Sequence, residues 1–380
     1  MSEVQRTLDR LIASPTVSSR PILELAAYVA QRCEDLGFDA ELLRDEDDPE
    51  KANVVCTLGP PGEDGLVLSG HMDVVPVDGQ PWSSDPFAMT AREGRLYGRG
   101  TADMKGFVAC TLEALGRLPL DNLRRQIALI WTHDEELGCL GSAKLVPKLE
   151  GRRLPSEALI GEPTDFQIFR MHPGHVAVTL ICLGESAHSS KPDLGANAIS
   201  AMARVVLMLE ALQVELSRER TLEAFLDRPF TVTNPAMIRG GAAVNLVPDR
   251  CELILGYRPL PGDDPLAVVR RIEARLAELP LPAGTSVQLA VDRVTPSMLT
   301  PAGTPLEHLL RPHACCPDPA AASYATDGGN LARLGMDCLI FGPGSIDVAH
   351  KADEYVAIDA LERGVDVVEA VVRARCLADT

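Results

Sequence analysis

Short apolar segments alternate with helix-like segments over the first 170 residues, and this alternation limits the possible folds more than any other feature of the chain. Helical spacing of apolar residues covers 22–36, after Pro21, and a second helix-like segment covers 107–118. The strand-like runs are 54–58, 66–69, 127–131 and 159–160. Such a pattern is typical of an α/β domain with a mostly parallel sheet. It resumes after about residue 295, with an apolar run at 338–341 and a helix over 358–375.

The middle of the chain follows a different order. Strand-like segments lie at 176–183, 230–238, 251–257 and 286–291, and helices are expected over 196–216 and from 265 onward. The order strand–helix–strand–strand–helix–strand is that of a ferredoxin-like α+β unit, which can be inserted into another domain. We therefore predict an α/β domain made of residues 1–176 and 296–380, with a smaller domain inserted at 177–295.

Charge and cysteine usage exclude several classes of protein. The chain has 36 Lys and Arg against 54 Asp and Glu, a net charge of −18. Such an acidic surface repels nucleic-acid phosphates and anionic lipids, so we expect neither a nucleic-acid nor a membrane partner. The first residues lack the features of a signal peptide, and no apolar run is long enough to span a bilayer. The ten cysteines contain no Cys-x-x-Cys pair, which favours free thiols in a reducing cytoplasm.

Acidic and histidine residues follow the predicted strands where those strands end. The residues concerned are His71 and Asp73, Glu135 and Glu136, Glu162, and His350, while a glycine-containing loop places Asp103 at a helix start. Each has an ordinary explanation when taken alone, such as a solvated acidic pair or a charge at a helix start. Because ligand sites of open α/β sheets form outside the carboxyl ends of the strands, we expect these side chains to converge.

Two histidines and three carboxylates from this set suit two divalent metal ions. Mixed histidine and carboxylate ligands favour zinc, with cobalt or manganese as substitutes. The adjacent Glu135 and Glu136 suit two roles, one as a ligand and one as a general base. His71 and Asp73 are two apart on an extended chain, so the Asp73 carboxylate is expected to hold the second ring nitrogen of His71. We find no Walker A motif and no nucleophile elbow, so this chemistry points to metal-assisted hydrolysis.

Five motifs extend these observations. They are Ser-Gly-His-Met-Asp-Val-Val-Pro at 69–76, Tyr-Gly-Arg-Gly-Thr-Ala-Asp-Met-Lys-Gly at 97–106, Asp-Glu-Glu at 134–136, Gly-Glu-Pro-Thr at 161–164 and Ala-His-Lys-Ala-Asp-Glu-Tyr at 349–355. Through them the chain resembles the di-zinc aminoacylase/carboxypeptidase family of amidohydrolases, from about residue 5 to the C-terminus. Segments 101–107, 258–262 and 342–345 make it most similar to the acetylornithine deacetylases within that family.

The resemblance implies a role for each residue. Asp103 would bridge both ions, His71 and Glu162 would complete one site, and Glu136 and His350 the other. Asp73 would orient His71, and Glu135 would be the base. His188 would reach the active site of a partner subunit and stabilise the oxyanion, and Asn245 and Arg258 would hold the substrate carboxylate. The inserted domain would then act as a lid and form the interface of a homodimer.

The implied reaction converts Nα-acetyl-ornithine to ornithine and acetate, a step of arginine biosynthesis. Alternatives are a succinyl-diaminopimelate desuccinylase, a broader N-acyl-amino-acid hydrolase, a dipeptidase, and a non-catalytic binding protein on the same fold. His133, Pro173 and the glycine-rich loop 324–330 depart from the subgroup pattern, which leaves the substrate open. His133, His172 and His175 are expected to pack or to support the site without binding metal.

Overall fold

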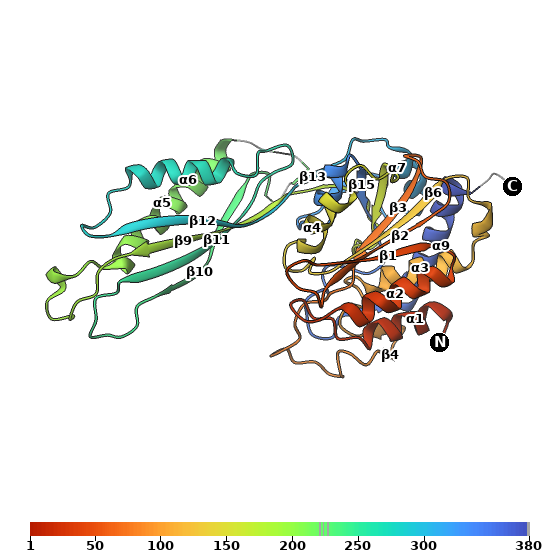
Figure 1. Ribbon diagram of the computed structural model, residues 1–380, viewed down its shortest axis with the longest axis horizontal. Coiled ribbons are helices and arrows are strands. Elements are labelled where there is room, and N and C mark those ends of the chain that lie inside the picture. Colours follow the sequence, from red (N-terminus) through yellow and green to blue (C-terminus); the bar gives the residue numbers. More distant parts are fainter. Residues whose placement is uncertain (220–221, 223, 226–227, 378–380) are drawn as a thin grey trace. The chain divides into compact units, whose positions relative to one another are not determined.

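The computed structural model describes residues 1–219, 222, 224–225 and 228–377. Two compact units make up the chain. The first comprises Met1–Met171, Met298–Ala322 and Thr326–Thr380, and the second comprises His172–Ser297 and Ser323–Ala325. One unit is therefore built from both ends of the chain and the other from its middle (Figure 1).

The large sheet of the first unit confirms the predicted α/β class. Its strand order is β1-β2-β6-β3-β7-β15-β8-β13, with β14 beside β8. The central strands β6, β3, β7 and β15 are parallel to one another. Strand β2 runs antiparallel to both β1 and β6, and β8 runs antiparallel to β15 but parallel to β14. The bounds are β1 Asp39–Arg44, β2 Ala52–Leu58, β3 Gly65–His71, β6 Gln126–Thr132, β7 Glu157–Ile160, β8 Phe169–His172, β13 Met298–Leu299, β14 Ala320–Ala321 and β15 Asp337–Ile340.

Helices cover both faces of this sheet, which explains why its central strands are continuously apolar. On one face, Leu66 and Leu68 of β3 belong to a core that also contains the buried sides of α1 (Glu3–Ile12), α2 (Leu23–Asp35), α3 (Lys105–Gly116) and α9 (Ile358–Cys376). Val67, between them, is equally buried but faces the opposite side. There α4 (Leu140–Leu149) and α8 (Gly328–Leu331) contact the sheet. The first unit thus has three layers, and α7 (Pro305–Leu310) packs against α9.

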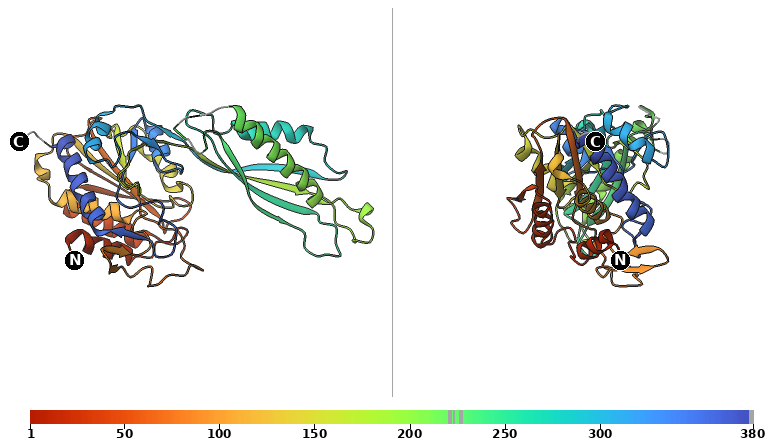
Figure 2. Two further views of the ribbon diagram at one scale, coloured as in Figure 1. Left: turned by 180° about the vertical axis from the view of Figure 1, so that it is seen from behind. Right: turned by 90° about the vertical axis from the view of Figure 1, so that its right-hand side faces the viewer.

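The second unit has the predicted ferredoxin-like order of elements. These are β9 His175–Leu183, α5 Ala198–Glu219, β10 Val232–Gly240, β11 Arg250–Arg258, α6 Ala267–Glu278 and β12 Ser286–Thr295. The strands form one antiparallel sheet in the order β10-β11-β9-β12. Alternate residues of β9, beginning with Val176 and Val178, pack under the two helices, which lie on the same face of the sheet (Figure 2). The other face of the sheet has no helix over it among the described residues.

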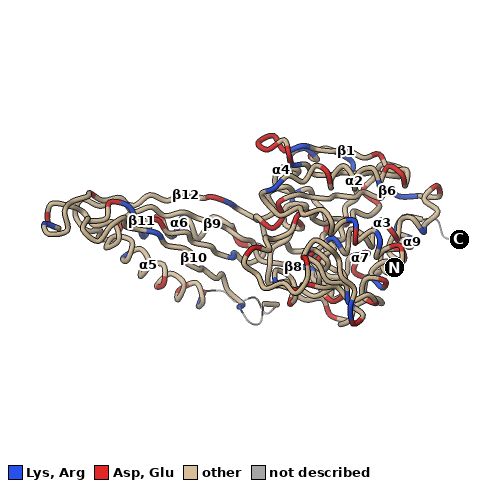
Figure 3. Tube along the Cα trace, turned by 90° about the horizontal axis from the view of Figure 1, so that it is seen from below, with Lys and Arg blue, Asp and Glu red and all other residues tan. Residues whose placement is uncertain are grey.

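A third, small sheet completes the first unit. It pairs β16 (Tyr355–Ala357) with β5 (Arg95–Tyr97) and β5 with β4 (Thr90–Arg92). This pairing brings the segment after His350 beside the loop that precedes Asp103, although 247 residues separate the two side chains in the sequence. Basic residues are interspersed with acidic ones along both units (Figure 3). Within the described ranges, no helix has the length and apolar character that a membrane span needs.

Candidate metal centre

Parallel strand pairing brings the predicted ligands to one edge of the large sheet. In the registers of β3 with its two neighbours, His71 lies opposite Thr132 of β6 and Ser69 lies opposite Ile160 of β7. The residues that follow β6 and β7 therefore emerge beside His71. Glu135 and Glu136 lie in the first of these segments, and Glu162 in the second.

The structure brings three of these side chains into a first possible metal-binding group. His71, Asp103 and Glu162 each offer a ligand atom, and these atoms all lie within 4.8 Å of one another. His71 Nε2 is 3.0 Å from Asp103 Oδ1, and all three residues are buried.

A second group shares Asp103 with the first. It consists of Asp103, Glu136 and His350, again with ligand atoms within 4.8 Å. His350 Nε2 lies 3.2 Å from Asp103 Oδ2 and 3.0 Å from Glu136. Because its two oxygens face two different histidines, Asp103 has the orientation that a bridging carboxylate needs.

The electrostatics of the cluster fit two bound cations. Burial, followed by repulsion from Asp103, raises the pKa of Glu162 well above its usual value, and the same two causes raise the pKa of Glu136. Burial also opposes ionisation of Asp103, but hydrogen bonds from His350 and His71 hold its pKa below its usual range. Several largely buried carboxylates thus lie close together, and the basic side chains bonded to them are two imidazoles, of which His350 is 50% exposed. Divalent ions would relieve this repulsion, and the histidine and carboxylate donors suit zinc.

Asp73 supports the site differently from the expected way. The second ring nitrogen of His71, Nδ1, lies 2.9 Å from the backbone carbonyl of Asp73 and 3.6 Å from its carboxylate. The carboxylate instead accepts hydrogen bonds from the N–H groups of Glu135 and Glu136, at 3.1 and 3.3 Å, and from the Ser18 hydroxyl at 2.7 Å. Asp73 therefore fixes the histidine with its main chain and the two glutamates with its side chain.

Glu135 lies in a buried environment that sequence reasoning did not foresee. Its carboxylate accepts a hydrogen bond from the thiol of Cys139 at 3.2 Å and lies close to the buried Asp327. Burial and the charge of Glu162 raise the pKa of Glu135 well above its usual value. Asp327 is held by the hydroxyls of Thr132 and Ser142. Two features of the sequence could have indicated this environment. One is Cys139, four residues after Glu135, because free cysteines are usually buried. The other is the acidic residue in the Thr-Asp-Gly-Gly sequence at 326–329.

The turn that presents Glu135 and Glu136 is anchored by charge. Asp134 has a left-handed backbone, with φ of 48°, which is uncommon for a residue with a side chain. Burial would raise the pKa of Asp134, but bonds from His133 and Lys51 lower it to about 2. The Lys51 side chain is 5% exposed and that of Asp134 is 9% exposed. His133, which departs from the subgroup pattern, contacts this turn through the Asp134 carboxylate, 3.3 Å from its Nδ1. It is not in either metal-binding group.

The remaining predicted site residues belong to the second unit. His188 is exposed and its Nδ1 bonds Ser190, while the segment around it pairs with the one around Asn245 through a Ser189 N–H to Asn245 carbonyl bond of 3.0 Å. Arg258, at the end of β11, is half-buried, and burial lowers its pKa. In the described part of the chain its guanidinium has no hydrogen-bond or ion-pair partner. Of these three residues, His188 and Asn245 lie close together, because the segments that carry them are paired.

His172 and His175 lie near Arg258 and are not in the metal-binding groups. Burial, the larger cause, and the charge of Arg258 lower the pKa of each to about 4, so both rings are neutral near pH 7. His172 Nδ1 bonds the Pro173 carbonyl at 2.8 Å. These two rings act as packing and hydrogen-bonding groups in the structure.

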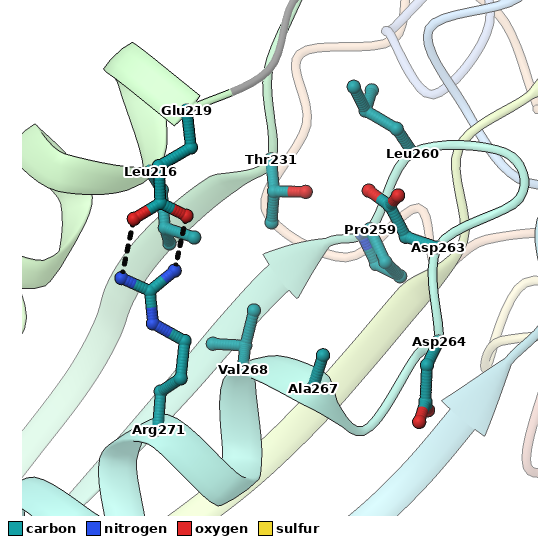
Figure 4. A pocket seen from close by; sticks show the side chains of 10 residues that line it. All are labelled: Leu216, Glu219, Thr231, Pro259, Leu260, Asp263, Asp264, Ala267, Val268 and Arg271. Carbon is teal, nitrogen blue, oxygen red and sulfur yellow. Dashed lines mark hydrogen bonds and ion pairs between the residues drawn. The ribbon is translucent and has the colours of Figure 1, made fainter.

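One cavity of about 240 Å³ lies wholly in the second unit and contains none of the predicted site residues (Figure 4). The ion pair between Arg271 and Glu219 crosses one side of it, and Asp263 and Asp264 lie on the other. The metal-binding groups of the first unit are therefore the better candidate for chemistry.

Comparisons with known proteins agree with this site. The family model described as peptidase family M20/M25/M40 matches residues 67–374. An acetylornithine deacetylase of Myxococcus xanthus is 35% identical over 378 residues, which cover 98% of this chain and 97% of that protein. An acetylornithine deacetylase of Pasteurella multocida is 33% identical, with 96% of each chain covered.

Solved structures show the same fold. An M20 family metallo-carboxypeptidase from Sulfolobus solfataricus superposes with a TM-score of 0.81 at 20% identity, covering 98% of this chain and 99% of that one. Human carnosine dipeptidase 1 superposes with a TM-score of 0.75 at 16% identity, covering 97% and 96%. From its sequence relatives and its fold, the chain belongs to peptidase family M20/M25/M40 and is a metal-dependent hydrolase that acts on amide bonds.

Proposed function

We propose that the protein removes the acetyl group from Nα-acetyl-ornithine, giving ornithine and acetate. The observation that carries the proposal is the pair of metal-binding groups that share Asp103, with the buried Glu135 beside them. The substrate is inferred from relatives named acetylornithine deacetylase, which are 33–35% identical over nearly the whole chain. Such a role would place the enzyme in arginine biosynthesis, in the cytoplasm.

Each metal-binding group would hold one divalent ion, with Asp103 shared between them. The donor set favours zinc, and cobalt is the expected substitute. When bound, the two ions would polarise the substrate carbonyl and lower the pKa of water.

The protein's own contribution to proton transfer would come from Glu135. Its carboxylate would accept a proton from the attacking water and deliver it to the amine nitrogen that leaves as the amide C–N bond breaks. The raised pKa of Glu135, caused first by burial, supports this role because a base must hold the proton before passing it on. The Cys139 thiol and the Glu135 N–H bond to Asp73 would fix the position of the carboxylate.

The second unit would supply the groups that bind the substrate. Arg258 has the properties of a carboxylate-binding residue, because its half-buried guanidinium has no acceptor among the described residues. Asn245 would assist it. His188 would reach the active site of the partner subunit and stabilise the oxyanion of the tetrahedral intermediate there.

A homodimer would be required for that role of His188. Strand β10 lies at one edge of the second unit's sheet, and its residues from Asn234 to Gly240 are exposed. Met237 and Ile238 on this strand are 44% and 57% exposed, and a bare strand edge readily pairs with another strand. A second copy of this chain would cover this edge.

Replacing Ile238 with lysine should weaken that dimer, because the charge would be placed on a self-complementary apolar edge. Sedimentation should show more monomer, and hydrolysis should fall in parallel as dimer is lost. Lysine at the exposed Leu42 of the first unit is the matched control. A monomer with full activity would contradict both the dimer and the role of His188 in trans.

A substrate panel tests the proposed reaction. Hydrolysis of Nα-acetyl-ornithine should exceed that of succinyl-diaminopimelate, acetyl-methionine and a dipeptide by at least tenfold in kcat/KM. A preference for another member of the panel would reject the substrate and keep the hydrolase, and turnover of none of them would reject the proposed function.

A further inference from the structure

A buried carboxylate outside the two metal-binding groups organises the loop that carries Asp103. Glu354 Oε1 accepts hydrogen bonds from the backbone N–H groups of Gly100, Ala102 and Asp103, at 3.0, 3.0 and 3.1 Å. The Glu354 side chain is 0% exposed. One oxygen thus gathers three donors of a single loop, so the backbone at the shared ligand Asp103 is tied to Glu354.

The other oxygen of Glu354 faces Arg99. Arg99 Nη1 donates to Glu354 Oε2 at 2.6 Å, and its side chain is 1% exposed. The same nitrogen lies 3.3 Å from the Lys351 carbonyl, and Arg99 Nη2 donates to Gln80 Oε1 at 2.7 Å. A buried ion pair is costly unless its remaining donors and acceptors are satisfied. Here both Glu354 oxygens and both terminal nitrogens of Arg99 have partners, while the buried Arg99 Nε has none among the described residues.

Gln80 extends this set of contacts to the second metal-binding group. Its Nε2 donates to the backbone carbonyl of His350 at 2.9 Å, and its Oε1 also accepts from the indole of Trp82. His350 has a left-handed backbone, with φ of 62°. A residue with a side chain persists in that conformation only when its surroundings hold it there. Gln80 and Arg99 bond His350 and its neighbour Lys351, and so provide that support.

We propose that Glu354, Arg99 and Gln80 are positioning residues that pre-form the metal site of Asp103, Glu136 and His350. The three side chains join the loop of Asp103 to the backbone of His350, whereas within the described ranges none of their hydrogen bonds reaches His71 or Glu162. This inference rests on the proposed two-ion function. Because Asp103 is shared by both groups, weakening the set would affect both ions through that residue. The ion bound by His350 should be affected more, because only its group has a second ligand, His350, tied to the set.

The test is a titration of chelator-stripped protein with Zn²⁺ by calorimetry, repeated with Co²⁺ to follow the absorption of each site. Wild type should bind two ions per chain. Glu354→Gln should bind one ion 10–100-fold more weakly, the usual loss when a group that orients a ligand is removed. The other ion should be weakened less, because its group shares only Asp103 with this set of contacts. His350→Ala and His71→Ala identify the two binding steps, and the step weakened in Glu354→Gln should be the one that His350→Ala removes.

Two further variants separate positioning from loss of stability. Glu157→Gln removes a different buried carboxylate, which pairs with Arg375 at the opposite end of β7, and should leave both affinities unchanged. Gln80→Met removes the bond to His350 without leaving a buried charge unpaired, and should weaken the same step as Glu354→Gln even if that variant does not fold.

The outcomes distinguish this inference from the function on which it rests. Unchanged affinities in Glu354→Gln and Gln80→Met, equal weakening of both steps, or an equal effect of Glu157→Gln would each overturn the positioning role alone. Wild-type protein that binds no divalent ion would overturn the proposed function and this inference with it.

Discussion

Replacing Glu135 with glutamine should reduce kcat for amide hydrolysis by a factor of about 10²–10⁴ while both metal ions remain bound. Glutamine has nearly the same shape but cannot accept a proton from water, and Glu135 is in neither of the two groups that share Asp103. The measurement is kcat together with the metal content of the same protein sample.

Glu150→Gln is the matched control, because it makes the same chemical change at an exposed position of the first unit. It should leave kcat unchanged. Activity of Glu135→Gln within about twofold of wild type, far inside the range expected for loss of a general base, would reject Glu135 as the base. Loss of metal together with activity would instead assign Glu135 to metal binding.

Replacing Asp103 with asparagine should have the largest effect on metal binding. Its two carboxylate oxygens face His71 and His350, so one substitution would remove a negative ligand from both ions. We expect both ions to bind at least about 100-fold more weakly, beyond the loss typical of a supporting residue, and hydrolysis to fall below detection at equimolar zinc. Calorimetry on chelator-stripped protein measures both affinities.

The control for this variant is Asp121→Asn, at an exposed position of the short 3₁₀ helix Leu120–Asn122 and in neither metal-binding group. It should bind two ions like wild type. If Asp103→Asn lost only one ion and kept the other at full affinity, Asp103 would be a ligand to a single metal and the bridging role would be wrong.

Much of the fold could be predicted because its signals are local. The strands that became β3 and β6 are short apolar runs, and their parallel pairing follows from the helix between them. The position of His71, Glu135 and Glu162 at one sheet edge follows from that topology alone. The order of elements in the inserted unit was predictable largely because its two central strands, β9 and β11, have clear apolar patterns.

Other features depend on contacts between distant segments, which a pattern of residues does not encode. The two-residue spacing of His71 and Asp73 predicted a contact between these two residues. It did not predict that the ring nitrogen would lie nearer the Asp73 carbonyl than the Asp73 carboxylate, because the strand ends at His71 and the chain turns after it. Asp327 reaches Glu135 from 192 residues away in the sequence. Glu354 likewise meets the loop of Asp103 only because β16 pairs with β5.

The most direct test of a two-ion amidohydrolase is the rate of Nα-acetyl-ornithine hydrolysis by chelator-stripped protein as zinc is added. The geometry of the shared carboxylate predicts no turnover without metal and a rate that stops rising at two zinc ions per chain. Turnover that persists in the absence of divalent ions, or a rate that saturates at one ion per chain with no further change, would contradict it.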